Sequence, residues 1–224
     1  MEGLISDRCF LGRIAASPGS IDYTGNTCQY ACAYCFANIN DCNRKEGLKA
    51  AINFLNKEKP STYADALLIS GYPICVSNRS DPFSPNNFAS TEALFTHLAE
   101  RDNGVFIQTK TNPECEFLID MLGPKKAVIY ISVSILNEEK SRIVEPKAPS
   151  TYERIETMKR LRSKGYHVIA AICPCSDVWL PKEDFIVLTN ELKKADVRHV
   201  RTFGYEPNKV KRNVAGSQKA ITLR

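Results

Sequence analysis

Apolar residues recur along the chain in two kinds of spacing that alternate. Short apolar runs are typical of buried strands, and apolar positions three and four residues apart are typical of amphipathic helices. Runs that favour strands lie at residues 21–26, 104–109, 128–135, 167–173 and 199–203. Two further runs, 65–70 and 73–77, flank Gly71, so another strand is expected in that region. Helical spacing occupies residues 47–56, 91–101, 113–122, 150–164 and 182–195.

These segments make about six β-α units in succession, and strands alternating with helices favour a parallel sheet covered by helices. We therefore expect an α/β fold, an incomplete (β/α)6 barrel, because a complete eight-unit barrel typically needs about 250 residues. An open doubly wound sheet would give the same periodicity and is the structural alternative. Ser90 or Thr91 is expected to cap the helix at 91–101.

The length and composition indicate one domain over residues 1–224. With 224 residues and 43% hydrophobic content, the chain is long enough to bury one core, and no change in composition separates a second one. Residues 208–224 are basic and weakly patterned, which predicts a poorly ordered tail.

The net charge does not identify a class of binding partner, and the chain lacks recognisable targeting or membrane-spanning signals. The formal charge of +5 is compatible with a polyanionic substrate but is also common in proteins that bind none. The start of the chain lacks an apolar run behind a basic head, and no stretch approaches the roughly 20 apolar residues of a membrane span. We therefore expect a cytoplasmic protein without membrane contact. Nine cysteines in that reducing compartment indicate metal or redox chemistry rather than disulfides.

Three cysteines carry the clearest chemical signal. Cys28, Cys32 and Cys35 are spaced C-x3-C-x2-C directly after the first predicted strand. Three thiolates on one loop can bind three irons of a [4Fe–4S] cluster and leave the fourth iron open for a chelating ligand. A structural zinc site is the alternative, but zinc requires a fourth ligand. No second cysteine pair follows at a suitable spacing, and the histidines are scattered along the chain.

With Tyr34 and Phe36 on either side of its last cysteine, this triad resembles the radical S-adenosylmethionine (SAM) superfamily. Further stretches, over about residues 19 to 180, resemble its spore photoproduct lyase-like branch, a group of DNA repair photolyase-like enzymes. Each is short, and together they occur in the order of that branch: SIDYTGNTCQYACAYCFA, Ser80-Asp81-Pro82-Phe83-Ser84-Pro85, Thr109-Lys110, Ser132-Val133-Ser134 and Arg142-Ile143-Val144-Glu145-Pro146.

The resemblance implies an activity and a set of ligands. In the superfamily, SAM chelates the open iron through its amino and carboxylate groups. One electron from the cluster cleaves SAM to methionine and a 5′-deoxyadenosyl radical, which abstracts a hydrogen atom from the substrate. An electron donor such as a flavodoxin or ferredoxin would then be a partner. By the same resemblance, the residues that help to hold SAM would be Tyr34, Phe36, Ser80, Asp81, Lys110, Ser132 and Ser134.

Residue chemistry supports part of this set. Lys110 ends an apolar strand, where an inward charge needs a partner such as the SAM carboxylate. The alternative is an exposed lysine at the start of a loop. Ser132 and Ser134 share one strand face, because side chains alternate along a strand. They would contact SAM or simply fill the interior of the barrel with small side chains.

Other members of the set also have structural alternatives. Tyr34 would lean on the adenine, as its counterparts do in the family, or act as a core aromatic. Asp81 would bind ribose hydroxyls or cap a turn. Glu145 is expected to anchor the loop before the next helix, with Arg142 as its ion-pair partner.

The sequence departs from spore photoproduct lyase at one functional position. That lyase returns a hydrogen atom from a cysteine just upstream of its Ser-Asp pair, where this chain has Asn78. Cys75 lies at an odd offset and should face the other side of its strand. Cys173 and Cys175 are the candidate catalytic thiols, at the end of the fifth strand. They would donate a hydrogen atom or form a transient disulfide, or serve only as small hydrophobes.

Three functions follow from these observations. The first is radical chemistry on a macromolecule, with nucleic acid as the leading substrate. The second keeps the enzyme class but acts on a peptide, a protein or a small metabolite. The third is a non-catalytic iron–sulfur or zinc protein. The nucleic-acid interpretation draws on the branch resemblance and on cations near the C-terminus: Arg198, Arg201, Lys209, Lys211 and Arg212.

Overall fold

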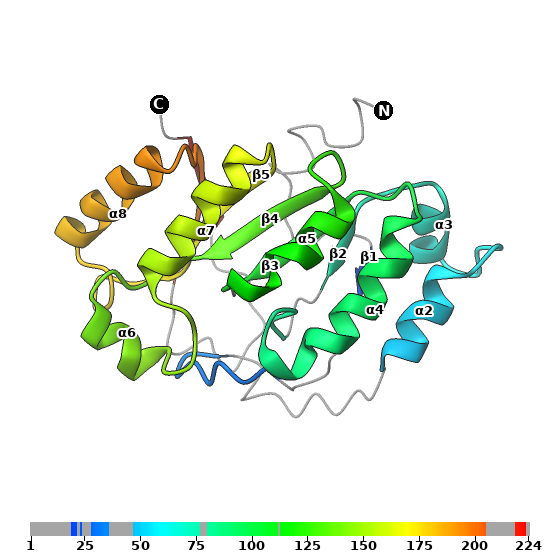
Figure 1. The fold of residues 1–224 in the computed structure, drawn as a ribbon, viewed down its shortest axis with the longest axis horizontal. Coiled ribbons are helices and arrows are strands. Elements are labelled where there is room, and N and C mark those ends of the chain that lie inside the picture. The colour runs from blue at the N-terminus through cyan, green and yellow to red at the C-terminus, as the bar shows by residue number, and fades with distance from the viewer. Residues whose placement is uncertain are drawn as a thin grey trace.

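The computed structural model describes residues 19–21, 23, 28–35, 47–76, 80–111, 113–204 and 218–222. They form a seven-stranded sheet in the order β1-β2-β3-β4-β5-β6-β7, with helices packed against it (Figure 1). The strands are β1 (Gly19–Ile21), β2 (Ile74–Val76), β3 (Val105–Thr109), β4 (Ala127–Ser132), β5 (His167–Cys175), β6 (His199–Gly204) and β7 (Gln218–Thr222).

The topology confirms the predicted α/β fold, an incomplete (β/α)6 barrel. Strands β1 to β6 pair in parallel with their neighbours, and their order in the sheet is their order in the chain. Strands β1 and β7 are the two edges, so the sheet does not close within the described part of the chain. Strand β7 was not predicted. It pairs antiparallel with β6 and lies inside the segment 208–224, which was expected to be poorly ordered.

The α-helices fill the connections between strands. They are α2 (Leu48–Leu55), α3 (Tyr63–Ile69), α4 (Phe88–Ala99), α5 (Glu116–Leu122), α6 (Glu138–Val144), α7 (Thr151–Ser163) and α8 (Lys182–Lys194). Two 3-10 turns, η3 (Pro85–Asn87) and η4 (Pro113–Cys115), precede α4 and α5. Helices α3 and α6 were not predicted: the apolar run at 65–70 lies largely in α3 and not in a strand, and α6 is short and mostly charged. None of the helices in the described ranges is long and apolar enough to cross a membrane.

The two faces of the sheet have different surroundings. One face packs against the helices, with α4, α5 and α7 lying across it in Figure 1. Residues such as Ile107, Ile129 and Ile131 on that face belong to the main core. The alternate positions face the inside of the open barrel, where a small apolar cluster forms: Cys75, Phe106, Val128, Tyr130 and Ile169.

Helix α4 begins earlier than its sequence predicts, and Thr91 is not its cap. The turn η3 leads directly into α4, which begins at Phe88 with Asn87 as its N-cap residue. Thr91 therefore lies inside the helix and is fully buried. Its hydroxyl hydrogen-bonds to Pro82 O (2.6 Å) and to the Tyr23 hydroxyl, which ties α4 to the segment after β2.

Helix α7 has a well-defined start that matters for the site. Ser150 accepts a hydrogen bond from Glu153 N (3.2 Å), and Glu153 accepts one from Ser150 N (2.7 Å). This reciprocal capping box satisfies two donors that the first turn would otherwise leave unpaired. It also fixes the turn that carries Arg154, a completely buried arginine.

We predict that Ser150→Ala lowers the free energy of unfolding by about 1 kcal/mol, because the first turn of α7 loses a capping acceptor. Chemical denaturation followed by far-UV circular dichroism measures the change. Ser163→Ala, at the exposed end of the same helix, is the matched control and should change stability by less than about 0.5 kcal/mol. Equal effects of the two substitutions would contradict the role of the cap.

Candidate active site

The three cysteines of the predicted cluster lie on one loop, residues 28–35, which is bound to the carboxyl ends of several strands. Tyr30 donates its hydroxyl to Phe83 O (3.0 Å), after β2, and to Thr111 O (3.2 Å), after β3. Ala33 N donates to Val144 O (2.8 Å) at the end of α6, beside which the loop passes in Figure 1. The loop is thus held at the edge of the sheet where β/α folds place their active sites.

The thiols of Cys28 and Cys32 are partly shielded from water. Cys32 is buried, and burial raises the pKa of its thiol to about 12, although the nearby Lys110 ammonium partly opposes that shift. Burial also raises the pKa of Cys28, whose sulfur receives hydrogen bonds from the backbone N–H groups of Asp81 and Tyr30. Such N–H donors to sulfur are a normal feature of iron–sulfur sites.

In their present arrangement, the described residues contain no group of three or more His, Cys, Asp or Glu side chains that could hold a metal ion. A [4Fe–4S] cluster makes a different demand, because each thiolate binds a different iron and the sulfurs need not converge on one ion.

Asp81 anchors the loop after β2 to the end of β3. Its carboxylate accepts hydrogen bonds from Phe83 N (2.9 Å), Thr109 Oγ1 (2.7 Å) and Lys110 N (2.5 Å). Burial raises the pKa of Asp81, whereas these three donors favour its charged form. In this structure its oxygens are thus used for the turn and the strand end.

Lys110 and Tyr34 meet at the carboxylate of Glu145. The Lys110 ammonium lies 2.8 Å from Glu145 Oε1 and 2.6 Å from the Tyr34 hydroxyl oxygen. The Tyr34 hydroxyl also donates to Glu145 Oε1. Two residues expected to hold SAM are therefore brought together, and Lys110 has an internal partner rather than lying exposed at a loop.

The expected Arg142–Glu145 ion pair is wrong. Arg142 lies on the outer side of α6, largely exposed, 3.9 Å from Glu138. The second partner of Glu145 is Arg154 of α7, whose guanidinium binds Glu145 Oε2. Arg154 also donates to Ser132 O (3.0 Å) and Pro149 O (2.7 Å), so it joins the strand end, the loop and the helix.

The serines of the predicted site lie at strand ends and are buried. Ser80 accepts a hydrogen bond from Asn87 Nδ2 (2.8 Å). Ser132 and Ser134 follow one another on the inner face of β4 and its extension. The Ser134 hydroxyl has no hydrogen-bond partner among the described residues, and neither has the Thr111 hydroxyl after β3. Unsatisfied buried hydroxyls beside the cysteine loop suit a polar ligand that completes them.

The two candidate catalytic thiols have different surroundings. Cys173 is partly exposed and lies near Lys110 and Glu145, and burial raises the pKa of its thiol to about 11. Cys175, also partly exposed, packs against the main core. Cys75 is buried in the inner apolar cluster, away from solvent. Phe36 and Asn78 lie outside the described residues.

Trp179 also lies at the site, although its sequence pattern did not predict this. Its ring is 5.3 Å from that of Tyr34, tilted by 37°. The turn that carries it is held by Trp179 N and Leu180 N, which both donate to Ser176 O (3.1 and 2.8 Å). Trp179 is the only tryptophan of the chain, and it follows the fifth strand in a stretch without periodicity. Its position after the end of a predicted strand was the one feature of the sequence that could have indicated a site residue.

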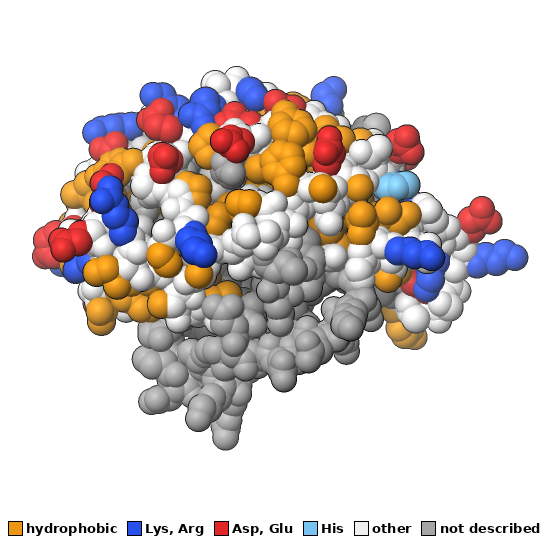
Figure 2. Space-filling view, turned by 60° about the horizontal axis from the view of Figure 1, so that its bottom comes forward, with side chains coloured by type: hydrophobic (Ala, Val, Ile, Leu, Met, Phe, Trp, Pro, Cys, Tyr) orange, Lys and Arg blue, Asp and Glu red, His pale blue; other side chains and the backbone are white. Residues whose placement is uncertain are grey.

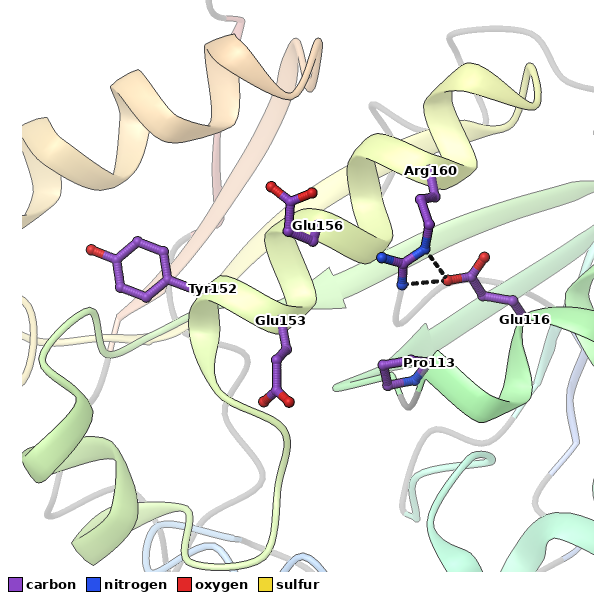
Figure 3. A pocket seen from close by; sticks show the side chains of 6 residues that line it. All are labelled: Pro113, Glu116, Tyr152, Glu153, Glu156 and Arg160. Carbon is purple, nitrogen blue, oxygen red and sulfur yellow. Dashed lines mark hydrogen bonds and ion pairs between the residues drawn. The ribbon is translucent and has the colours of Figure 1, made fainter.

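A separate pocket lies on the outer surface of the helices (Figure 3). It has a volume of about 580 Å³, is open to solvent, and lies between the start of α5 and helix α7. Arg160 and Glu116 form an ion pair (2.6 Å) across it. None of the cysteine-loop residues lines it, so we do not assign it to the active site. Its lining residues are Pro113, Glu116, Tyr152, Glu153, Glu156 and Arg160.

Comparison with known proteins supports the fold. No family model matches the chain. "Uncharacterized protein ORF301" of Acidianus two-tailed virus is 26% identical over 140 residues, which are 60% of this chain and 46% of that protein. Streptococcus suis SuiB bound to S-adenosylmethionine has a TM-score of 0.62 at 14% identity, over 84% of this chain and 40% of SuiB. Spore photoproduct lyase complexed with dinucleoside spore photoproduct has a TM-score of 0.50 at 14% identity, over 79% and 49%.

The chain therefore has the same fold as SuiB and spore photoproduct lyase. It spans less than half the length of each of these three relatives.

The pKa of Glu145 yields a prediction about acid stability. Burial raises this pKa, but Lys110 and Arg154 outweigh burial and hold it at about 2, below the ordinary 4.5. Glu145 therefore contributes stability that is present above pH 4.5 and is lost as the pH falls toward 2. We expect Glu145→Gln to lower the free energy of unfolding at pH 7 by roughly 3 kcal/mol, with a smaller difference at pH 3.5.

Denaturation with urea at pH 7, 5 and 3.5 measures this difference. Glu138→Gln makes the same chemical change on the exposed side of α6 and should leave stability nearly unaltered at each pH. A stability difference for Glu145→Gln that does not depend on pH would contradict the depressed pKa.

Proposed function

We propose that this chain is a radical SAM enzyme in which Cys28, Cys32 and Cys35 bind three irons of a [4Fe–4S] cluster and SAM binds the fourth. The observation that carries the proposal is the placement of the three-cysteine loop. It lies at the carboxyl ends of the parallel strands, bound to the segments after β2 and β3 and to α6. The same fold occurs in SuiB, whose structure has S-adenosylmethionine bound.

The residues present fit both groups. The backbone donors to Cys28 suit a thiolate on iron, because hydrogen bonds to the sulfurs stabilise their negative charge. The unsatisfied hydroxyls of Ser134 and Thr111 suit the polar groups of SAM. Lys110 supplies a cation for its carboxylate, and Tyr34 with Trp179 supplies aromatic surface for its adenine.

When bound, the reduced cluster supplies one electron that breaks the C5′–S bond of SAM, giving methionine and a 5′-deoxyadenosyl radical that takes a hydrogen atom from the substrate. The chain binds and orients the reactants and shields them from water. A one-electron donor of the flavodoxin or ferredoxin class returns the cluster to its reduced form. These requirements favour a reducing, cytoplasmic location.

For the substrate, we propose a macromolecule, with nucleic acid first. The branch resemblance and the shared fold with spore photoproduct lyase support this choice. The cations near β6 do not add to it. Arg198 is paired with Asp196 (2.9 Å), and Arg201 is buried with its guanidinium over the Tyr130 ring. Lys209, Lys211 and Arg212 lie outside the described residues.

The described surface supplies no broad positive patch on the face seen in Figure 2, where Lys and Arg side chains alternate with Asp and Glu. We propose that a nucleic-acid substrate is recognised at the barrel mouth, beside the cysteine loop. A peptide substrate is the second candidate, because SuiB, with the same fold, has been solved with its precursor peptide SuiA.

We predict that the purified protein, reconstituted with iron and sulfide without oxygen and reduced with dithionite, converts SAM to methionine and 5′-deoxyadenosine. Cys32→Ala should lose the cluster absorbance and at least about 100-fold of the 5′-deoxyadenosine rate, because one of the three iron ligands is missing. Chromatography of the products and iron analysis measure both effects.

Cys115→Ala is the matched control, since Cys115 is a buried core cysteine outside the loop. It should retain iron content and cleavage. A cluster that assembles without SAM cleavage would contradict the enzyme, and zinc bound in place of iron would contradict the cluster as well.

We also propose Cys173 as the thiol that completes turnover. Its S–H bond would give a hydrogen atom to the carbon-centred substrate radical, forming a C–H bond and a thiyl radical. One electron from the same class of donor, with a proton, would restore the thiol. Cys175 is the less favoured donor because it packs against the core.

DNA and RNA oligonucleotides and peptides are first compared for a substrate-dependent rise in 5′-deoxyadenosine. With the substrate so found, turnover in D2O should place one deuterium in the product, because the thiol hydrogen exchanges with solvent. Cys173→Ala should abolish this incorporation while still forming 5′-deoxyadenosine, and Cys175→Ala should not. Mass spectrometry measures the deuterium content of the product. Undiminished deuterium with Cys173→Ala would exclude this thiol.

A further inference from the structure

The buried ion cluster beside the cysteine loop is not electrically balanced. Lys110, Glu145 and Arg154 have side-chain exposures of 11%, 0% and 0%, and the two cations share one carboxylate. The pKa of Glu145 is held at about 2, so it is ionised at neutral pH. The directly bonded cluster therefore carries one net positive charge. An uncompensated charge shielded from water is costly, and an anion that binds beside it relieves the cost.

Neighbouring groups do not cancel this charge by direct contact. The Tyr34 hydroxyl donates its proton in a hydrogen bond to Glu145 Oε1, so it adds no negative charge to the cluster. Asp81 binds the backbone N–H of Lys110 and is itself held by two further donors. The ion pairs within 4 Å in the described part of the chain join Lys110 to Glu145 and not to Asp81.

Each of the two carboxylate oxygens of Glu145 binds a different cation. Oε2 binds Arg154, while Oε1 binds Lys110 and Tyr34. Arg154 is fixed in addition by the carbonyl oxygens of Ser132 and Pro149, so it is held in place even when Lys110 is not. Without Arg154, the whole charge of Glu145 would be left to neutralise Lys110.

We propose that Arg154 keeps the Lys110 ammonium available for an anionic ligand by taking up the charge of Glu145. Arg154 is thus a positioning residue, since it acts through Glu145 and Lys110 and does not touch the ligand. The ligand group it serves is a carboxylate, which the SAM of the proposed function carries. The identity of the ligand as SAM rests on the proposed function. The expectation that the ligand group is negatively charged rests on the net positive charge of Lys110, Arg154 and Glu145.

Charge restoration tests the proposal. Arg154→Met lets Glu145 neutralise Lys110 and should weaken SAM binding roughly 10- to 100-fold, the range of a lost charge-assisted hydrogen bond. The double variant Arg154→Met/Glu145→Gln restores one net positive charge and should bind SAM within about threefold of the wild type. Arg154→Lys keeps the charge but not the fork of donors, and should also bind within about threefold.

SAM binding is measured by calorimetry on the cluster-loaded protein and by Trp179 fluorescence on the cluster-free protein. Trp179 is a suitable reporter because its ring lies 5.3 Å from Tyr34, which is bonded to Lys110. Decarboxylated SAM is the second probe. It lacks the carboxylate, so Arg154→Met should leave its binding within about twofold of the wild type. Glu138→Gln is the control variant for each titration.

Equal weakening of SAM and decarboxylated SAM by Arg154→Met would overturn the proposal, because the effect would then not involve the carboxylate. A double variant as weak as Arg154→Met, or no saturable binding of SAM by the wild type, would also overturn it. If Arg154→Met does not fold, SAM binding by the double variant and by Arg154→Lys is compared with that of the wild type instead. Failure of the proposed function looks different: no cluster assembles and no SAM is cleaved, while carboxylate-dependent binding to the cluster-free protein persists.

Discussion

The carboxylate of Glu145 joins the parts of the chain that make the site. It follows α6 and binds Lys110 at the end of β3, Tyr34 in the cysteine loop and Arg154 on α7. These residues are far apart in the sequence, and the fold brings them to one edge of the sheet. A carboxylate that is fully buried must have its lone pairs satisfied, so its partners are positionally constrained. The geometry of the cysteine loop therefore depends on this group as much as on the strands.

The inner face of the sheet changes character along the strand direction. Near the amino ends of the strands it is filled by large side chains, such as Phe106 and Tyr130, with Arg201 over the Tyr130 ring. Toward the carboxyl ends, β4 continues with Ser132 and Ser134, and β5 with Cys173. The side chains at this end are thus smaller and more polar. An apolar interior at one end and a more polar one at the other is how this class of fold separates stability from chemistry.

Local patterning was enough to predict the central parallel strands β2 to β6, because each buried strand and each amphipathic helix carries its own periodicity. The spacing of Cys28, Cys32 and Cys35 was likewise readable from the sequence. Contacts between side chains that are brought together only by folding could not be predicted from the sequence. Arg142 lies only three residues before Glu145 in the sequence, but Arg154 is nearer in space because a loop and the start of α7 turn it inward. Strand β7 was missed since its segment lacks a clear pattern, although β6 provides it with a pairing edge.

Burying three charged side chains to hold a loop costs a large desolvation free energy. Apolar side chains of similar volume often stabilise a core equally well or better, because they avoid the cost of removing charges from water. Arg154 is surrounded by the carbonyl oxygens of Ser132 and Pro149 and by Glu145, so its hydrogen-bonding groups are used to hold it exactly where α7 meets the strand end. Stability alone does not explain two cations for one carboxylate. The second cation is explained if the site must attract a negatively charged group, since Lys110 lies near the Cys32 thiol and is bonded to Tyr34 of the cysteine loop.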